Sequence, residues 1–250
     1  MTKFVTMAVF FAAIIVSAPM IVIAGNVPWS YTGPNGPEHW ADMSQEFKLC
    51  GSGKEQSPIN ISGAKSENLP AIQFDYKPGS LEILHNGHTV LIKRAKSNNV
   101  IVGGEQYELL QFHFHAPGEN TVDGKTFPME IHLVHKNAKG KIMVLGVFVR
   151  AGTKNAVLEK AWNHMPKQSG DRRKVASVNI NAIDLLPTDR SYYRFKGSIT
   201  IPPCSEGIEW IVLKTPVEVS DEQIKQFSQV VGANARPVQP VYSRTLYMTE

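Results

Sequence analysis

Two segments in which histidines alternate with bulky apolar residues constrain this chain more than any other feature. The first is Gln-Phe-His-Phe-His from Gln111 to His115, and the second begins with Glu130-Ile131-His132. Successive side chains of a β-strand point to opposite faces, so each segment places its histidines on one face and its apolar residues on the other. If the two strands pair, three imidazoles converge, with Gln111 and Glu130 behind them as hydrogen-bond acceptors that fix the histidine tautomers.

Three neutral nitrogen ligands with an open fourth position are typical of a catalytic zinc site, so His113, His115 and His132 are the predicted ligands. The alternative is a solvated strand face, on which alternating histidines also occur. The apolar residues at every intervening position favour strands buried on their far side, with the histidines facing a cleft. Val134 follows His132 by two residues and is predicted to share its face, whereas His135 is predicted to point away into the core.

The remaining sequence predicts one domain preceded by a signal peptide. Residues 1–24 carry a single cation, Lys3, then an apolar run that ends at Ala24, which is typical of a secretory signal peptide. An uncleaved membrane anchor is the alternative, because the apolar run is nearly long enough to span a bilayer. Residues 25–250, rich in strand-like runs and without repeats or linkers, predict a single domain.

Strand patterns outnumber helical ones. Expected strands cover 71–76, 81–84, 89–94, 100–102, 107–115, 129–136, 142–150, 192–199 and 207–213, and Asn86-Gly87 predicts a hairpin turn. Expected helices cover 156–165 after Asn155 and 221–231, the latter with Ser220 and Gln223 as a capping box. The sequence predicts a large mixed or antiparallel sheet with short peripheral helices.

The charge pattern excludes one class of partner. The formal net charge is +4, and no stripe of Lys and Arg with interleaved aromatic residues is present, so nucleic acid is not an expected partner. Basic residues gather between Lys167 and Lys174, but Asp171 interrupts them and favours a solvated loop.

The chain has two cysteines, Cys50 and Cys204. An exported protein with an even number of cysteines favours one disulfide, and two unrelated buried thiols are the alternative.

Several motifs together resemble the α-class carbonic anhydrases from about Trp29 to Arg244. They are GPEHW, QSPINI, the NGH at Asn86 to His88, QFHFHAPGEN, EIHLVH, GSITIPPC and EWIVLK, in the order and spacing of that family. The resemblance implies a mostly β (α+β) single domain with a central, twisted, mainly antiparallel ten-stranded sheet and the metal in a conical cleft. It also implies that Cys50 and Cys204 form a disulfide.

The resemblance further implies reversible hydration of CO₂ to bicarbonate by zinc-activated water. Thr200 and Glu119 match the hydroxyl and carboxylate that orient the attacking oxygen, and His88 matches the proton shuttle. The other positions that the resemblance assigns are grouped by role: Tyr31 and Asn86 for the proton-carrying waters, Asn234 behind the metal ligands, and Val144, Ile199, Ile201 and Trp210 beside Val134 in the substrate pocket. Ile201 stands where many members have threonine or another small or polar residue, and we expect it to narrow the cleft.

Two other functions are compatible with this sequence pattern. One is a non-catalytic binding module on the same fold, although such relatives typically lack one or more of the metal histidines that this chain retains. The other is ester hydrolysis by the same zinc site, expected as a side activity. The predicted protein is periplasmic or secreted, is a monomer or weak dimer, acts on small molecules and has no membrane attachment after signal cleavage.

Overall fold

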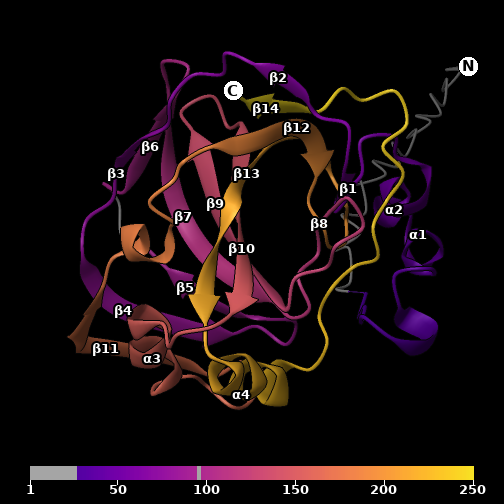
Figure 1. Cartoon of the computed structure of the whole chain (residues 1–250). Coiled ribbons are helices and arrows are strands. Elements are labelled where there is room, and N and C mark those ends of the chain that lie inside the picture. The colour runs from indigo at the N-terminus through magenta and orange to yellow at the C-terminus, as the bar shows by residue number, and fades with distance from the viewer. Residues whose placement is uncertain (1–26, 95–96) are drawn as a thin grey trace, which may run out of the picture.

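A large twisted sheet runs through the computed structural model, which describes residues 27–94 and 97–250 (Figure 1). The predicted signal peptide, residues 1–24, lies outside the described residues. Along the sheet the strands follow the order β11 (Arg172–Ile180), β4 (Gly79–His85), β5 (Val90–Lys93), β7 (Glu105–His115), β9 (Met129–Asn137), β10 (Ile142–Ala151), β13 (Glu206–Val219), β12 (Tyr192–Ser198), β14 (Tyr247–Thr249) and β2 (Lys65–Glu67).

This continuous path of ten strands agrees with the expected sheet, and two further strands branch from it. β6 (Asn99–Val102) pairs with β7, and β3 (Gln73–Asp75) pairs with β6. Most pairs are antiparallel, as predicted, but β10 with β13 and β14 with β2 are parallel. A separate two-stranded sheet joins β1 (Asn60–Ile61) to β8 (Thr121–Val122).

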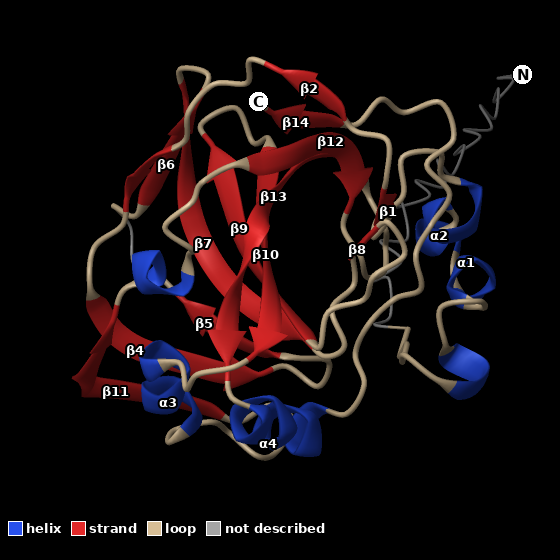
Figure 2. Cartoon of the chain, viewed as in Figure 1, coloured by secondary structure: helices blue, strands red, loops and turns tan. Residues whose placement is uncertain are grey.

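Short helices lie around the rim of the sheet (Figure 2). They are α1 (Trp40–Met43), α2 (Leu49–Ser52), α3 (Ala156–Trp162) and α4 (Asp221–Val231), with 3₁₀ turns η1 (Gly33–Asn35), η2 (Gln45–Phe47) and η3 (Ala182–Leu185). α3 begins after Asn155, whose side chain accepts hydrogen bonds from Val157 and Leu158. α4 carries the predicted capping box of Ser220 and Gln223 and ends before Gly232. The caps satisfy N–H groups that the first turn of a helix leaves without partners.

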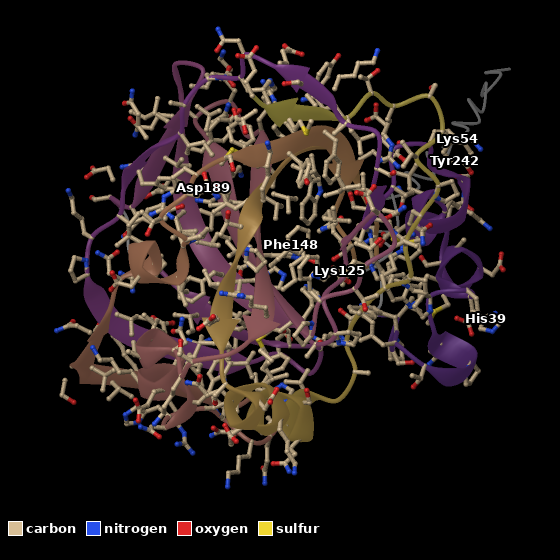
Figure 3. All side chains as sticks on the ribbon, viewed as in Figure 1. His39, Lys54, Lys125, Phe148, Asp189 and Tyr242 are labelled. Atoms are coloured by element: carbon tan, nitrogen blue, oxygen red, sulfur yellow. A yellow bond between two sulfur atoms is a disulfide. The ribbon has the colours of Figure 1, made fainter. Side chains whose placement is uncertain are left out.

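The sheet separates two apolar cores. The larger core lies on the face that carries Phe112 and Phe114, both 0% exposed, and α3 and α4 cover part of it. The smaller core lies on the face that carries the histidines and is built around Phe148 and Trp210, with Phe148 near the centre of the molecule in Figure 3. Because both faces are covered, the central strands are largely buried.

Two contacts link the amino-terminal elements to later parts of the chain. Cys50 of α2 forms a disulfide with Cys204, with a Cα–Cα distance of 5.1 Å, which confirms the predicted pairing. The Lys54 ammonium lies 4.5 Å from the ring centroid of Tyr242, and Figure 3 shows these two side chains together where the carboxy-terminal segment passes α2. The disulfide and the cation–π contact hold distant parts of the sequence side by side.

One sequence prediction was wrong in a way that matters for the site. Lys167 to Lys174 was expected to be a solvated loop, but Arg172 begins β11, the edge strand that pairs with β4. Only one edge of β11 is paired, and charged side chains on such an edge strand discourage pairing with another chain.

Within the described residues, none of the helices combines the length and apolar character needed to span a bilayer.

We expect removal of the disulfide to lower the stability of the protein. The bridge closes a loop with a sequence separation of 154, which contributes roughly 4 to 5 kcal/mol in the chain-entropy model. Urea unfolding of a Cys50→Ser, Cys204→Ser double variant should therefore give a clearly lower midpoint than the oxidised protein. Equal midpoints would show that the bridge does not limit the unfolded ensemble.

Acid should destabilise the metal-free protein through a buried imidazole. His135 is 0% exposed and shares a 2.6 Å hydrogen bond with the Tyr76 hydroxyl, and burial lowers the pKa of His135 to about 3. In the unfolded chain His135 takes up a proton near pH 6.5, whereas in the folded chain it stays neutral. The contribution of neutral His135 to the free energy of unfolding is therefore fully present above pH 6.5 and declines as the pH falls towards 3. Chemical unfolding between pH 7 and 4 should show a steeper loss of stability in the wild type than in His135→Gln.

Candidate metal centre

The predicted metal ligands meet because β7 and β9 pair in one particular register. His113 stands directly opposite His132, and His115 stands opposite Glu130. A bulge between Leu109 and Gln111 shifts the alternation of β7. Leu109 therefore points into the larger core, while Gln111, His113 and His115 share the other face.

One nitrogen of each imidazole is already engaged by the protein. Nδ1 of His113 lies 2.9 Å from Oε1 of Gln111, and Nδ1 of His115 lies 2.7 Å from the carbonyl oxygen of Asn234. Nε2 of His132 lies 3.0 Å from Oε1 of Glu130. These oxygens are acceptors, so the engaged nitrogens are donors and the opposite nitrogen of each ring carries a lone pair.

The three nitrogens are arranged as ligands for a metal. Each ring offers one ligand atom, and these atoms lie within 4.8 Å of one another. Nε2 of His115 is buried and has no hydrogen-bond partner, which is costly unless something else binds it. Burial lowers the pKa of all three histidines, and the neighbouring imidazoles add to this effect on His113 and His132. The rings are therefore neutral, as metal ligands must be, and the donor set fits a divalent cation.

Glu130 is the most heavily bonded residue behind the ligands. Its Oε2 accepts hydrogen bonds from the backbone N–H groups of Glu119 and Asn120, and its Oε1 accepts one from the Asn120 side chain. Gly146 of β10 makes room for it, because a Cβ at that position would lie 3.1 Å from Oε1 of Glu130. Burial raises the pKa of Glu130, and the Asn120 hydrogen bonds oppose that shift.

Glu119 lies inside the site itself. Its Oε2 is 3.5 Å from Nε2 of His115 and 3.9 Å from Nδ1 of His132, and its Oε1 accepts from the backbone N–H of Arg236. Burial raises the pKa of Glu119 to about 8 in the metal-free site, while the Arg236 N–H and the Thr200 side chain act in the opposite direction. A cation bound at the histidines would favour the carboxylate form.

An apolar cavity adjoins the histidines. It has a volume of about 180 Å³, and its lining includes His113, His132 and Thr200. The rest of the lining is apolar and comprises Val134, Ile142, Val144, Ile199, Ile208 and Trp210. Such a cavity suits a small apolar molecule placed next to a polar reacting group.

Comparison with known proteins agrees with this geometry. The model of the eukaryotic-type carbonic anhydrase family matches residues 35–250. The chain belongs to the α-carbonic anhydrase family. A carbonic anhydrase from Neisseria gonorrhoeae is 44% identical over 87% of this chain and 86% of its own, and one from Pectobacterium carotovorum is 45% identical over 88% and 91%.

Solved structures show the same fold. The α-carbonic anhydrase of Thermovibrio ammonificans, in complex with the inhibitor sulfanilamide, superimposes with a TM-score of 0.86 at 44% identity and covers 90% of this chain and 100% of its own. Dioscorin complexed with ascorbate superimposes with a TM-score of 0.83 at 29% identity, covering 89% and 98%. Proteins named carbonic anhydrase and dioscorin therefore share this fold.

The predicted proton shuttle of this carbonic anhydrase lies against an aromatic ring. His88 follows the Asn86-Gly87 turn and stacks on Trp29, with centroids 3.7 Å apart and planes inclined by 8°. Burial, followed by the nearby His85, lowers the pKa of His88. Tyr31 is also close, with its ring centroid 6.5 Å from that of His88, and burial raises its pKa. Oδ1 of Asn86 accepts from the backbone N–H groups of His88 and Thr89, so it shapes the turn.

Asn234 connects the shuttle segment to a metal ligand. Its side-chain nitrogen donates to the carbonyl oxygens of His88 and Phe114, and its side-chain oxygen accepts from the backbone N–H of Ala116. Its own carbonyl oxygen accepts from His115. Any displacement of Asn234 would therefore disturb both His88 and His115.

The role predicted for Ile201 stays a prediction; its carbonyl oxygen accepts a hydrogen bond from the backbone N–H of Cys204. The other predicted pocket residues, Val134, Val144, Ile199 and Trp210, line the cavity. Ile142 and Ile208 were missed but also line it, and both were identifiable from strand alternation, since they precede Val144 and Trp210 by two residues.

Arg236 is a further residue that sequence reasoning missed. Its buried guanidinium donates to the side chain of Gln56 and to the carbonyl oxygens of Ser57 and Cys50, while its backbone N–H holds Glu119. The group therefore joins the disulfide region to the site across long sequence separations. Local pattern carries no signal for such a contact.

Loss of the Gln111 acceptor should weaken metal binding. Gln111→Ala leaves Nδ1 of His113 without its partner, and the loss of such a contact typically costs 10- to 100-fold in metal affinity. Competitive titration with a chromophoric chelator should show this loss. Gln106→Ala is the control, because Gln106 lies exposed on the same strand, and its affinity should match the wild type. Equal affinities for both variants would mean that Gln111 does not orient the ligand.

Proposed function

We propose that this protein is a zinc-dependent carbonic anhydrase that converts CO₂ and water reversibly into bicarbonate and a proton. The observation that carries the proposal is the convergence of three lone-pair nitrogens, from His113, His115 and His132, beside an apolar cavity. Family membership and the similarity to bacterial carbonic anhydrases support the same activity. Three neutral nitrogen ligands with one open position favour zinc.

The metal and the protein have separate tasks in this proposal. A zinc ion held by three neutral nitrogens supplies a Lewis acid that makes water nucleophilic near neutral pH. Gln111, Glu130 and the Asn234 carbonyl hold the imidazole tautomers that leave the lone pairs free. The charge of the cation also stabilises Glu119 as a carboxylate, which the metal-free site disfavours.

Thr200 and Glu119 would orient the attacking oxygen. An ionised carboxylate can only accept, so the Thr200 hydroxyl must donate to Glu119. The remaining lone pairs of the Thr200 oxygen then accept a hydrogen bond from the attacking water and direct it towards the cavity. Arg236 keeps Glu119 in place through its backbone N–H.

CO₂ would occupy the apolar cavity before reaction. Val134, Val144 and Trp210 offer it a wall without hydrogen-bonding groups, next to the histidines. Bicarbonate is charged and is poorly accommodated by that wall, which favours release of the product into water.

His88 would carry the released proton out of the site. Imidazole takes up and gives off protons near neutral pH, and His88 lies half-buried near Tyr31. Tyr31 and Asn86 would hold waters along this route.

The disulfide supports a location outside the cytoplasm. Bridges persist in oxidising compartments such as the periplasm or the extracellular space, and the bond between Cys50 and Cys204 suits either one. We infer a periplasmic or secreted enzyme released by cleavage after residue 24, acting on small molecules as a monomer or weak dimer.

A non-catalytic binding module is the second candidate function, because dioscorin, which shares the fold, has been solved in complex with ascorbate. Stopped-flow measurement of CO₂ hydration by the mature protein separates the two. We expect rapid hydration that a chelator abolishes and added zinc restores. A folded, zinc-loaded protein without hydration above background would contradict the enzyme and favour the binding module. Ester hydrolysis, measured on the same samples, should be weaker and equally zinc-dependent.

Replacement of His88 should slow proton release without affecting metal binding. His88→Ala should lower kcat for hydration about a hundredfold in weakly buffered solution, the lower end of the range for loss of a proton-transfer group. Millimolar imidazole in solution should restore part of the rate, and kcat/KM for CO₂ should stay unchanged. A decrease in kcat/KM equal to that in kcat would place His88 in the hydration step itself.

A further inference from the structure

A row of side chains crosses the sheet from the metal ligands to its edge. Cross-strand partners link His132 to His113, His113 to Leu91, Leu91 to Leu84, and Leu84 to Arg172 of the edge strand β11. Partners in register share a face of the sheet. Arg172 therefore lies on the same face as the metal ligands, three strands from His113, or about 14 Å at the usual strand spacing.

The segment that leads into β11 also packs against the turn that carries His88. The backbone N–H of His85 donates to the carbonyl oxygen of Asp171, and that of Gly170 donates to the carbonyl oxygen of His85. A Cβ on Gly87 would lie 2.9 Å from Oγ of Ser169. The residues that precede Arg172 are thus in contact with the turn that leads to His88.

Arg172 forms no ion pair in the described part of the chain, although Asp171 precedes it in the sequence. In residues 27–94 and 97–250, neither Arg172 nor Lys174 takes part in an ion pair. Lys174 stands opposite Glu82, which offsets part of its charge, but Arg172 stands opposite Leu84. Leu84 and Leu91 form an apolar surface between the guanidinium and the site, and a low-dielectric wall of this kind focuses the field of a nearby charge.

We propose that Arg172 recruits small oxyanions to the mouth of the cleft, and that hydrogen phosphate is thereby favoured as the final proton acceptor. The inference rests on the proposed function. Each turnover converts CO₂ and H₂O into HCO₃⁻ and H⁺, and the proton passes from His88 to HPO₄²⁻ to give H₂PO₄⁻. Arg172 takes no part in a bond that forms or breaks; it raises the local concentration of the dianion.

The chain offers a matched control on the same strand. Arg173 is also exposed, but it stands opposite Ile83, which is 0% exposed in the larger core, so it lies on the other face of the sheet. Arg172→Glu and Arg173→Glu change the net charge equally and differ in the face from which the charge acts. Arg172→Lys keeps the charge and should behave like the wild type.

The test is stopped-flow CO₂ hydration by the zinc-loaded variants in low-millimolar buffer, where acceptance of the proton limits kcat. One series uses phosphate, and the other uses 1,2-dimethylimidazole, which is neutral in its basic form. We expect Arg172→Glu to lower the phosphate-supported kcat about threefold relative to Arg173→Glu, the scale of one reversed charge acting through water. The variants should match in 1,2-dimethylimidazole.

Salt and the reverse reaction complete the test. Raising the ionic strength to about 0.5 M shortens the screening length to about 4 Å and should remove the difference in phosphate. Bicarbonate dehydration by Arg172→Glu shows whether Arg172 recruits bicarbonate as well as hydrogen phosphate. A lower kcat/KM for bicarbonate would mean that Arg172 recruits both anions. An unchanged kcat/KM would mean that it recruits only the phosphate buffer.

Equal effects of Arg172→Glu and Arg173→Glu in phosphate, or an equal loss in both buffers, would overturn the role of Arg172. Wild-type protein that is active in both buffers would keep the proposed function intact in that case. Zinc-loaded wild type that is inactive in both would overturn the proposed function itself.

Discussion

The structure of the site depends on the pairing of β7 with β9. This register places His113 opposite His132 and His115 opposite Glu130. A slip of β7 by one residue would turn His113 and His115 into the larger core and Phe112 and Phe114 into the cleft. Phe112 and Phe114 are 0% exposed. Moving them out of the core and burying imidazoles in their place would cost much free energy, and this cost fixes the register. The burial of the apolar residues on one face of the sheet thus determines where the histidines lie on the other face.

The same burial sets the electrostatics of the site. The histidines, Glu119 and Glu130 are withdrawn from water together, which disfavours the charged form of each group. The imidazoles become neutral, Nε2 of His115 has no partner in the protein, and Glu119 shifts towards its protonated form. A divalent cation held by His113, His115 and His132 would remove these costs together, because it would engage the free lone pairs and favour the carboxylate form of Glu119. The protein therefore holds its metal site in a state that a cation stabilises.

Much of the site followed from the sequence because alternation is a local property. The ligands, their partners Gln111 and Glu130, and the wall residue Val134 all lie on two strands with strong patterns. β11 was missed because its exposed, cationic residues show no apolar alternation over Arg172 to Lys174. Arg236 and the Asn234 carbonyl were harder still to assign, since their contacts join residues more than a hundred positions apart.

Three imidazole nitrogens should bind one zinc ion and leave one position open. X-ray absorption at the zinc edge of the zinc-loaded protein is the decisive measurement. We predict a four-coordinate ion with three imidazole nitrogens at about 2.0 to 2.1 Å and one further light atom from solvent. A spectrum that showed sulfur, carboxylate ligation from the protein, or fewer than three imidazoles would contradict the account.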